Sequence, residues 1–234
     1  MIDNSGAFSR LELLIGEQGI ELLSTAKILL CGIGGVGSWT AEMLIRAGVG
    51  NLTIVDFDTI EISNLNRQLP ALHSTLGQKK LDCLKERLLD IAPEARITCI
   101  DRKITSENCA TLLSSDDWDY VIDAIDDRKA KLALIKYCVE NSIAIISSMG
   151  SGNRLSASQV AISDISKTFS CPLAKILRKE LKKNGISSGV KVVYSSELPV
   201  LSEPSVESHT SRACKSAKRP LGTISYMPAL FGLR

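Results

Sequence analysis

Residues 27–56 read KILLCGIGGVGSWTAEMLIRAGVGNLTIVD and contain the pattern that decides the fold. The apolar run Lys27–Cys31 predicts a strand buried on both faces, and it leads directly into the glycine-rich stretch 32–37. A helical pattern over 36–47 and a second apolar run over 52–56 follow. A Gly-x-Gly-x-x-Gly loop between a strand and a helix is typical of phosphate binding, because the glycines admit the phosphates and the helix N-terminus offers N–H donors. We therefore predict a nucleotide site, with Asp56 accepting hydrogen bonds from ribose hydroxyls.

Strands and helices continue to alternate along the chain. Apolar runs predict further strands at 97–100, 120–124, 143–147, 159–163 and 190–195. Helical patterns lie at 76–91, 106–113, 129–140 and 172–183, another opens at 229–233, and the first 25 residues predict one or two short helices. The predicted fold class is α/β: a Rossmann-like, mostly parallel sheet with helices on both faces, extended by extra C-terminal strands.

Length and composition suit one domain over 1–234, with a helical segment 1–26, a nucleotide-binding core 27–150 and a C-terminal part 151–234. The chain shows neither a signal peptide nor an apolar stretch long enough for a membrane helix, so we expect a cytoplasmic protein without membrane contact. Its seven cysteines form no Cys-x-x-Cys pair and only two histidines are present, so no zinc site is predicted.

The net charge of +2 conceals an uneven distribution. Residues 165–234 contain 12 Lys/Arg and 4 Asp/Glu, a balance of +8, whereas residues 1–164 have a balance of −6. A basic final third favours a polyanionic partner, and a lysine-rich solvated surface is the equal alternative on charge alone. The candidate phosphate-contacting residues are Lys167, Lys175, Arg178, Lys179, Lys182, Lys183, Arg212, Lys215, Lys218 and Arg219.

Charged motifs after the second strand favour group transfer over a dehydrogenase. DFD (56–58) is followed by NLNRQ (64–68) and GQKK (77–80), and arginine and lysine there suit neutralisation of a triphosphate as pyrophosphate leaves. DAIDD (123–127) ends the predicted fourth strand at the carboxyl edge of the sheet. We interpret Asp123 as a structural cap and Asp126 as a ligand for magnesium bridging the phosphates.

Taken together, GIGGVG, DFD, NLNRQ, GQKK and DAIDD resemble the ATP-dependent adenylating enzymes related to ubiquitin-activating enzyme. Within that superfamily the chain is similar to the tRNA threonylcarbamoyladenosine dehydratases, through GIGGVGSW, VIDAID and the terminal KRPLGTISYMPALFG. The resemblance implies a homodimer in which Arg10 reaches the partner's ATP site. It also implies that Arg10, Arg67, Lys80 and Asp126 are catalytic, Asp126 holding Mg²⁺. The implied ATP-binding residues are Gly32, Gly34, Gly35, Gly37, Asp56, Asp58, Asn64, Arg67, Gln68 and Lys80.

The activity implied by this resemblance is ATP-dependent cyclisation of N6-threonylcarbamoyladenosine at position 37 of tRNA, through adenylation of the threonyl carboxylate and loss of AMP. The alternative is adenylation of the C-terminal glycine of a ubiquitin-like or sulfur-carrier protein, which would bring a sulfur-transfer partner. A nucleotide-sensing module is a third hypothesis. For Cys171, before Pro172, we favour a small semi-buried side chain over a reactive thiol, which a helix N-terminus would activate if it were exposed.

Overall fold

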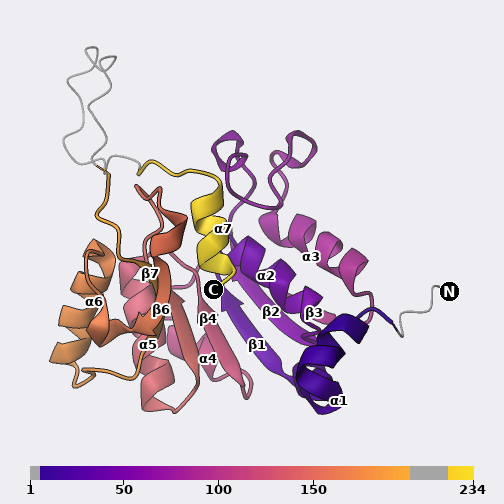
Figure 1. Cartoon of the computed structure of the whole chain (residues 1–234), viewed down its shortest axis with the longest axis horizontal. Coiled ribbons are helices and arrows are strands. Elements are labelled where there is room, and N and C mark those ends of the chain that lie inside the picture. The colour runs from indigo at the N-terminus through magenta and orange to yellow at the C-terminus, as the bar shows by residue number, and fades with distance from the viewer. Residues whose placement is uncertain (1–5, 201–220) are drawn as a thin grey trace.

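A seven-stranded sheet forms the centre of the computed structural model, which describes residues 6–200 and 221–234 (Figure 1). Its strand order is β3-β2-β1-β4-β5-β7-β6, and every neighbouring pair is parallel except β6 with β7. The strands are β1 Lys27–Cys31, β2 Asn51–Asp56, β3 Arg96–Asp101, β4 Tyr120–Asp123, β5 Ile145–Ser148, β6 Val160–Asp164 and β7 Lys191–Ser195. The predicted α/β class and the two additional C-terminal strands are confirmed.

The helices fall close to their predicted positions. Because Gly77 has a φ of 82° and a 3-10 turn precedes it, the helix expected from 76 begins at Lys80. The first helix bends at Gly16, where φ is 73° and ψ is 170°, so it consists of two short pieces. None of the helices within 6–200 and 221–234 has the length and hydropathy to cross a bilayer. The helices are α1 Ser9–Thr25, α2 Gly37–Arg46, α3 Lys80–Ile91, α4 Cys109–Leu113, α5 Arg128–Glu140, α6 Pro172–Lys183 and α7 Tyr226–Gly232.

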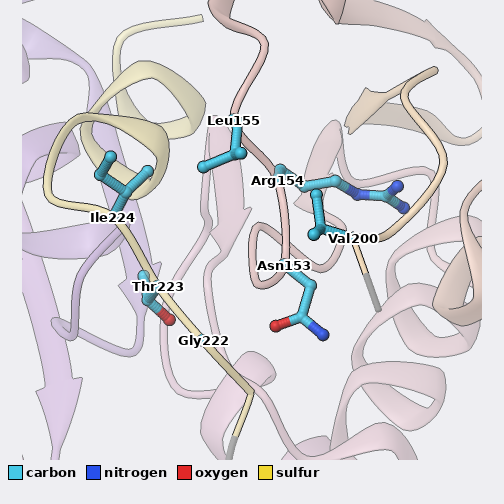
Figure 2. Close-up of a pocket in the computed structure, with 7 residues that line it drawn as sticks. All are labelled: Asn153, Arg154, Leu155, Val200, Gly222, Thr223 and Ile224. Carbon is cyan, nitrogen blue, oxygen red and sulfur yellow. The ribbon is translucent and has the colours of Figure 1, made fainter. Parts of the chain in front are cut away.

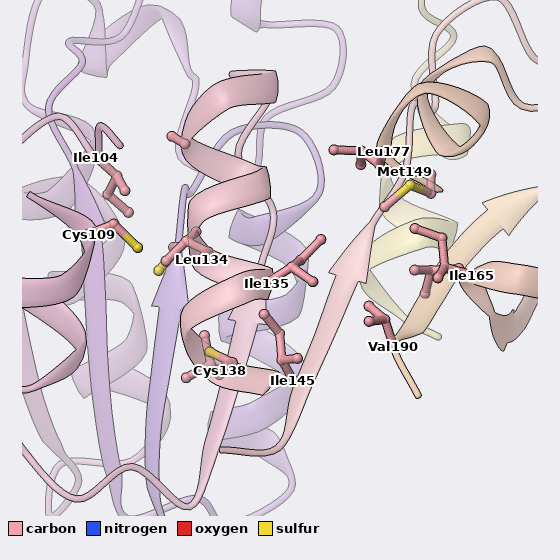
Figure 3. Packing of buried hydrophobic residues seen from close by; sticks show 14 of the residues in the cluster. Ile104, Cys109, Leu134, Ile135, Cys138, Ile145, Met149, Ile165, Leu177 and Val190 are labelled. Carbon is pink, nitrogen blue, oxygen red and sulfur yellow. The ribbon is translucent and has the colours of Figure 1, made fainter. Parts of the chain in front are cut away.

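Two hydrophobic clusters cover the two faces of the sheet. In β1, Ile28 and Leu30 pack into the cluster that includes buried residues of α2 and α3, whereas Leu29 and Cys31 pack with α4, α5 and α6. This alternation follows from the two-residue period of a strand. Figure 3 shows the cluster on the side of α4, α5 and α6, in which Met149 lies among apolar side chains. The near-continuous apolar sequence of β1 is thus explained by burial of both faces.

The strand order reverses direction around β1, which lies between β2 and β4. The loops that follow β1 and β4 therefore leave in opposite directions at the carboxyl edge of the sheet. A crevice at such a point is where open α/β sheets bind ligands. This topology brings the glycine loop (32–37) and the acidic loop (123–127) to the same edge.

Burial raises the pKa of three cysteine thiols in the cluster between the sheet and α5. Desolvation raises the pKa of Cys109 and of Cys138 to about 12 and, together with the charge of Asp123, raises the pKa of Cys31 well above 9.0. Between pH 9.0 and about 12 the folded protein therefore keeps thiol protons that the unfolded chain has lost. We expect the free energy of unfolding to fall as pH rises above 9.0, by at most about 1.4 kcal/mol per pH unit for each thiol. Urea titrations across this range should show a shallower fall in a Cys109→Ala/Cys138→Ala variant, and an equal fall in both proteins would contradict the assignment.

Candidate nucleotide-binding site

Asp56 anchors the glycine loop from the end of β2. Its Oδ2 accepts the backbone N–H of Ile33 at 2.8 Å, and its Oδ1 accepts those of Phe57 and Asp58 at 2.8 and 2.9 Å. The side chain is buried, so these three donors offset the cost of desolvating a carboxylate. In the ligand-free chain Asp56 holds the loop in place, and its contact with a ribose stays a prediction.

The loop has no room for side chains at its base. Gly32 has a φ of 86°, and a Cβ at Gly37 would lie 1.9 Å from the carbonyl oxygen of Gly32. A Cβ at Gly34 would meet nothing closer than Gln68 Nε2, at 3.8 Å. The N-terminus of α2, at Val36, receives no side-chain cap, and although the Ser38 N–H donates to the Gly34 carbonyl at 3.1 Å, this helix end suits an anion. Gly32 and Gly37 therefore shape the turn, while Gly34 faces the space that phosphates would occupy.

Gly37→Ala should accordingly damage the fold as well as the site. The clash costs about 1–3 kcal/mol or more, since backbone must move to relieve it. Gly34→Ala is the matched control: we expect an unchanged melting temperature and weaker ATP binding, because its methyl group would crowd only the ligand. Thermal unfolding and ATP titration of both variants measure these effects. Equal melting temperatures would contradict the role assigned to Gly37.

The NLNRQ segment packs directly on the glycine loop. Ser38 Oγ donates to the Gly34 carbonyl at 2.7 Å and accepts the Leu69 N–H at 3.2 Å, and Trp39 Nε1 donates to the carbonyl of Arg67 at 3.2 Å. Ser38 and Trp39 were missed by sequence reasoning, although their place on the first turn after the loop was a usable signal.

Arg67 and Gln68 flank the loop itself. Arg67 Nη1 donates to the Ser63 carbonyl and to Asn66 Oδ1, at 2.7 and 3.0 Å, and its aliphatic part lies 3.2 Å from where a Gly35 Cβ would stand. Gln68 is buried, and its Oε1 has no hydrogen-bond partner among the described residues. A buried acceptor without a donor favours a ligand at this position, since such groups are rarely left unpaired.

Lys80, Asp58 and Asn64, three further predicted ATP-binding residues, contact groups of the protein itself. Lys80 is 4% exposed, and its Nζ lies 2.7 Å from Asp58 Oδ2. Asn64 Oδ1 accepts the Glu61 N–H at 3.2 Å, which closes the turn before NLNRQ. The predicted ATP residues thus lie in one region of the structure. Lys80, however, is paired with Asp58, and Asn64 accepts a hydrogen bond within its own turn. Their contacts with a triphosphate stay predictions.

Two aspartates of the acidic loop, Asp123 and Asp127, hold the local backbone in place. Asp123 is fully buried: its Oδ2 lies 2.8 Å from Lys131 Nζ and accepts the Ser147 hydroxyl at 2.6 Å, while its Oδ1 accepts the Ile125 N–H at 3.2 Å. Asp127 caps α5 through the N–H of Ala130. Asp126 is exposed. The structural interpretation of Asp123 is confirmed, although the buried ion pair with Lys131 was missed.

Arg10 and Cys171 lie outside this site. Arg10 is exposed on α1, which packs beside the amino end of β2, away from the glycine loop (Figure 1). Cys171 is 4% exposed at the start of α6. Its burial agrees with the favoured interpretation and disfavours a reactive thiol. Within residues 6–200 and 221–234, His, Cys, Asp and Glu form no group of three that would hold a metal ion.

Among the described residues of the basic region, Lys167 is exposed in the turn before α6, and the outer surface of α6 contains further exposed lysines. Arg178 does not belong to that surface, because its Nη1 donates to the Thr168 carbonyl at 2.8 Å and braces α6 against the preceding turn. One guanidinium nitrogen of Arg178 is therefore engaged within the protein, and its contact with a phosphate stays a prediction. Arg212, Lys215, Lys218 and Arg219 lie outside the described residues. The exposed lysines of α6 are Lys175, Lys179, Lys182 and Lys183.

The C-terminal helix α7 completes the site from an unexpected direction. Thr40 Oγ1 on α2 donates to the Gly232 carbonyl at 3.1 Å, and Pro228 lies 3.1 Å from where a Gly35 Cβ would stand. Asn66 Nδ2 donates to the Thr223 carbonyl at 2.9 Å. The end of the chain therefore closes over the glycine loop (Figure 1). No local signal in the sequence predicts this placement.

Comparison with known proteins agrees with this geometry. The ThiF family model matches residues 8–233. A Bacillus subtilis tRNA threonylcarbamoyladenosine dehydratase is 41% identical over 229 residues, which is 97% of this chain and 90% of that protein. The crystal structure of Escherichia coli tRNA N6-threonylcarbamoyladenosine dehydratase in complex with ATP superposes with a TM-score of 0.85 at 35% identity, covering 97% of this chain and 89% of that one. An E. coli molybdopterin-synthase adenylyltransferase is 33% identical over only 55% of this chain and 51% of its own length.

Proposed function

The chain belongs to the ThiF family, and from this premise we propose that it is an ATP-dependent tRNA threonylcarbamoyladenosine dehydratase. The observation that carries the proposal is the extent of the similarity. The dehydratase relative aligns over 97% of the chain, whereas the carrier-protein adenylyltransferase aligns over 55%. The ATP complex of the E. coli dehydratase supports ATP as the co-substrate.

The reaction requires adenylation followed by ring closure. A threonyl carboxylate oxygen attacks the α-phosphorus of ATP, the bond to the β-phosphate breaks, and pyrophosphate leaves. A nucleophilic group of the same modification then attacks the activated carboxyl carbon and gives its proton to solvent. AMP departs with the former carboxylate oxygen, so the base loses the atoms of one water. No protein nucleophile is needed, and the chain contributes orientation and charge neutralisation.

Several residues suit these tasks. The uncapped N-terminus of α2 and the guanidinium of Arg67 would neutralise charge on the phosphates. Asp126 is the residue that would hold Mg²⁺, and a single exposed carboxylate suits an ion that keeps waters and phosphate oxygens as its other ligands. Bound Mg²⁺ would withdraw charge from the triphosphate. Lys80, held by Asp58, would contact the triphosphate if this ion pair opens when ATP binds.

We further propose a homodimer, with Arg10 completing the partner's ATP site. Its exposure on α1, away from its own glycine loop, supports this arrangement. The α1 helix also exposes large apolar side chains, including Leu13 at 87% and Leu14 at 83%, which favour a protein contact. We place the enzyme with its tRNA substrate in the cytoplasm.

The proposed tRNA surface is the lysine face of α6. Lys179→Glu/Lys182→Glu/Lys183→Glu should weaken tRNA binding and reduce the slope of log affinity against log salt by about two to three, since each lost phosphate contact removes about one unit. ATP affinity should not change. Lys85→Glu, on α3 at the other end of the sheet, is the control for a reversed charge (Figure 1). Unchanged tRNA binding in the triple variant would place the RNA elsewhere.

Mass spectrometry of tRNA nucleosides tests the activity directly. The protein is incubated with Mg²⁺ and tRNA bearing threonylcarbamoyladenosine, with and without ATP. We expect ATP-dependent conversion to a nucleoside lighter by one water. No conversion, together with ATP–pyrophosphate exchange that requires a carrier protein ending in Gly-Gly, would overturn the proposal and favour protein activation.

A further inference from the structure

A cavity of about 330 Å³ opens between residues 153–155 and 222–224 (Figure 2). We call it the side cavity, and its lining residues are Asn153, Arg154, Leu155, Val200, Gly222, Thr223 and Ile224. We infer that the side cavity receives the modified base itself, the threonylcarbamoyl-bearing purine, turned out of the tRNA. This inference rests on the proposed function and assigns the place of its second substrate.

The walls of the side cavity are tied together. The Asn153 N–H donates to the Gly222 carbonyl at 2.7 Å, and the Asn153 carbonyl accepts the Val200 N–H at 2.9 Å. Tyr226 Oη donates to the Leu155 carbonyl at 2.7 Å. These contacts join segments that are far apart in the chain, so the hollow is preformed, as binding pockets usually are.

The side cavity is also linked to the ATP site. Thr223 in its wall accepts a hydrogen bond from Asn66, which precedes Arg67, and Arg67 lies against Gly35 of the glycine loop. Across the carboxyl edge of the sheet, the order is Asp56 after β2, the glycine loop after β1, and the side-cavity wall in the loop after β5.

With the ribose at Asp56, as predicted, this order places the adenine of ATP away from the side cavity. If its ribose lies at Asp56, its triphosphate extends over the glycine loop, and the adenine is on the β2 side of that loop. The side cavity lies on the opposite side, where a second substrate would approach the α-phosphate. A carboxylate attached to a base in the side cavity would therefore face the atom that it must attack.

The apolar and amide groups of the lining suit a purine. The side chains of Leu155, Val200 and Ile224 are 53%, 45% and 37% exposed, and they give the hollow an apolar surface for a flat ring. Asn153 adds a side-chain amide, the group that pairs with the edge of adenine. Enzymes that modify a base take it out of its stack into such a pocket, and loop bases of RNA are the easiest to turn out. Arg154 stiffens this wall from behind, because its Nη2 donates to the Ser170 carbonyl at 3.1 Å.

Leu155→Trp tests the inference by filling the side cavity. Leu198→Trp is the matched control, since Leu198 is 73% exposed and lies outside the lining. We expect Leu155→Trp to raise KM for modified tRNA about tenfold or more, as the loss of a base contact does, and to leave ATP affinity unchanged. It should also remove the preference of the protein for modified over unmodified tRNA. Asn153→Asp, an isosteric change that keeps the local φ of 55° accessible, should lose the same preference without loss of stability.

Three outcomes would overturn the assignment. They are equal effects of Leu155→Trp and Leu198→Trp, weaker binding of modified and unmodified tRNA alike, and loss of ATP affinity in Leu155→Trp. Failure of the proposed function is distinguishable, because the unaltered protein would then convert no modified tRNA and show no preference for it. Direct titration with the free threonylcarbamoyladenosine nucleoside gives a readout besides activity.

Discussion

Arg67→Ala is expected to lower kcat about 10²–10³-fold while ATP affinity changes much less. Arg67 lies against the glycine loop, and its Nη1 is already held by the Ser63 carbonyl and Asn66 Oδ1. These bonds orient the remaining N–H groups before any substrate binds. Charge on the departing pyrophosphate increases in the transition state, so a fixed cation contributes more there than in the ground state.

Single-turnover adenylation and equilibrium ATP binding, measured side by side, separate these two effects. Arg96→Ala is the matched control, since Arg96 is exposed at the amino end of β3, across the sheet from the site. A rise in KM with unchanged kcat would show that Arg67 only binds ATP. The sensor hypothesis would be favoured if the unaltered protein shows no turnover and Arg67→Ala loses ATP binding.

Lys131→Met is expected to lower the free energy of unfolding by about 3–5 kcal/mol, because it leaves the Asp123 carboxylate buried without its cation. Both side chains are 0% exposed, and Lys131 Nζ also donates to the Ser148 carbonyl at 2.9 Å. For a chain of this size the melting temperature should fall by about 10 °C. Lys129→Met, at an exposed position of the same helix, should have little effect.

A second substitution distinguishes loss of charge balance from loss of packing. Adding Asp123→Asn removes the unpaired charge, and we expect the double variant to recover much of the lost stability. Asp123 also accepts the N–H of Ile125, the residue before Asp126. We therefore expect Lys131→Met to disturb Asp126 as well and to weaken the Mg²⁺ dependence of turnover. A melting temperature of Lys131→Met within about 2 °C of that of the unaltered protein would contradict the stabilising role assigned to the Lys131–Asp123 pair.

Local sequence patterns predicted most of the fold. The strands were predicted from short apolar runs and the helices from a period of 3.6 residues, and neighbouring residues alone specify both patterns. Boundaries shifted where a glycine with positive φ intervened, as at Gly77 before α3. The glycine loop could also be predicted from the sequence, since the strand, turn and helix around it are consecutive.

The sequence by itself therefore determined the class of sheet, the position of the glycine loop and the family of the chain. Only the tertiary structure decided that Lys131 is buried against Asp123, that Arg178 braces a turn, and that α7 closes over the glycine loop. It also brought residues 153–155 and 222–224 together around the side cavity. The physical reason is distance along the chain: burial and pairing depend on contacts between remote segments, and no local pattern encodes which remote segment a side chain will meet.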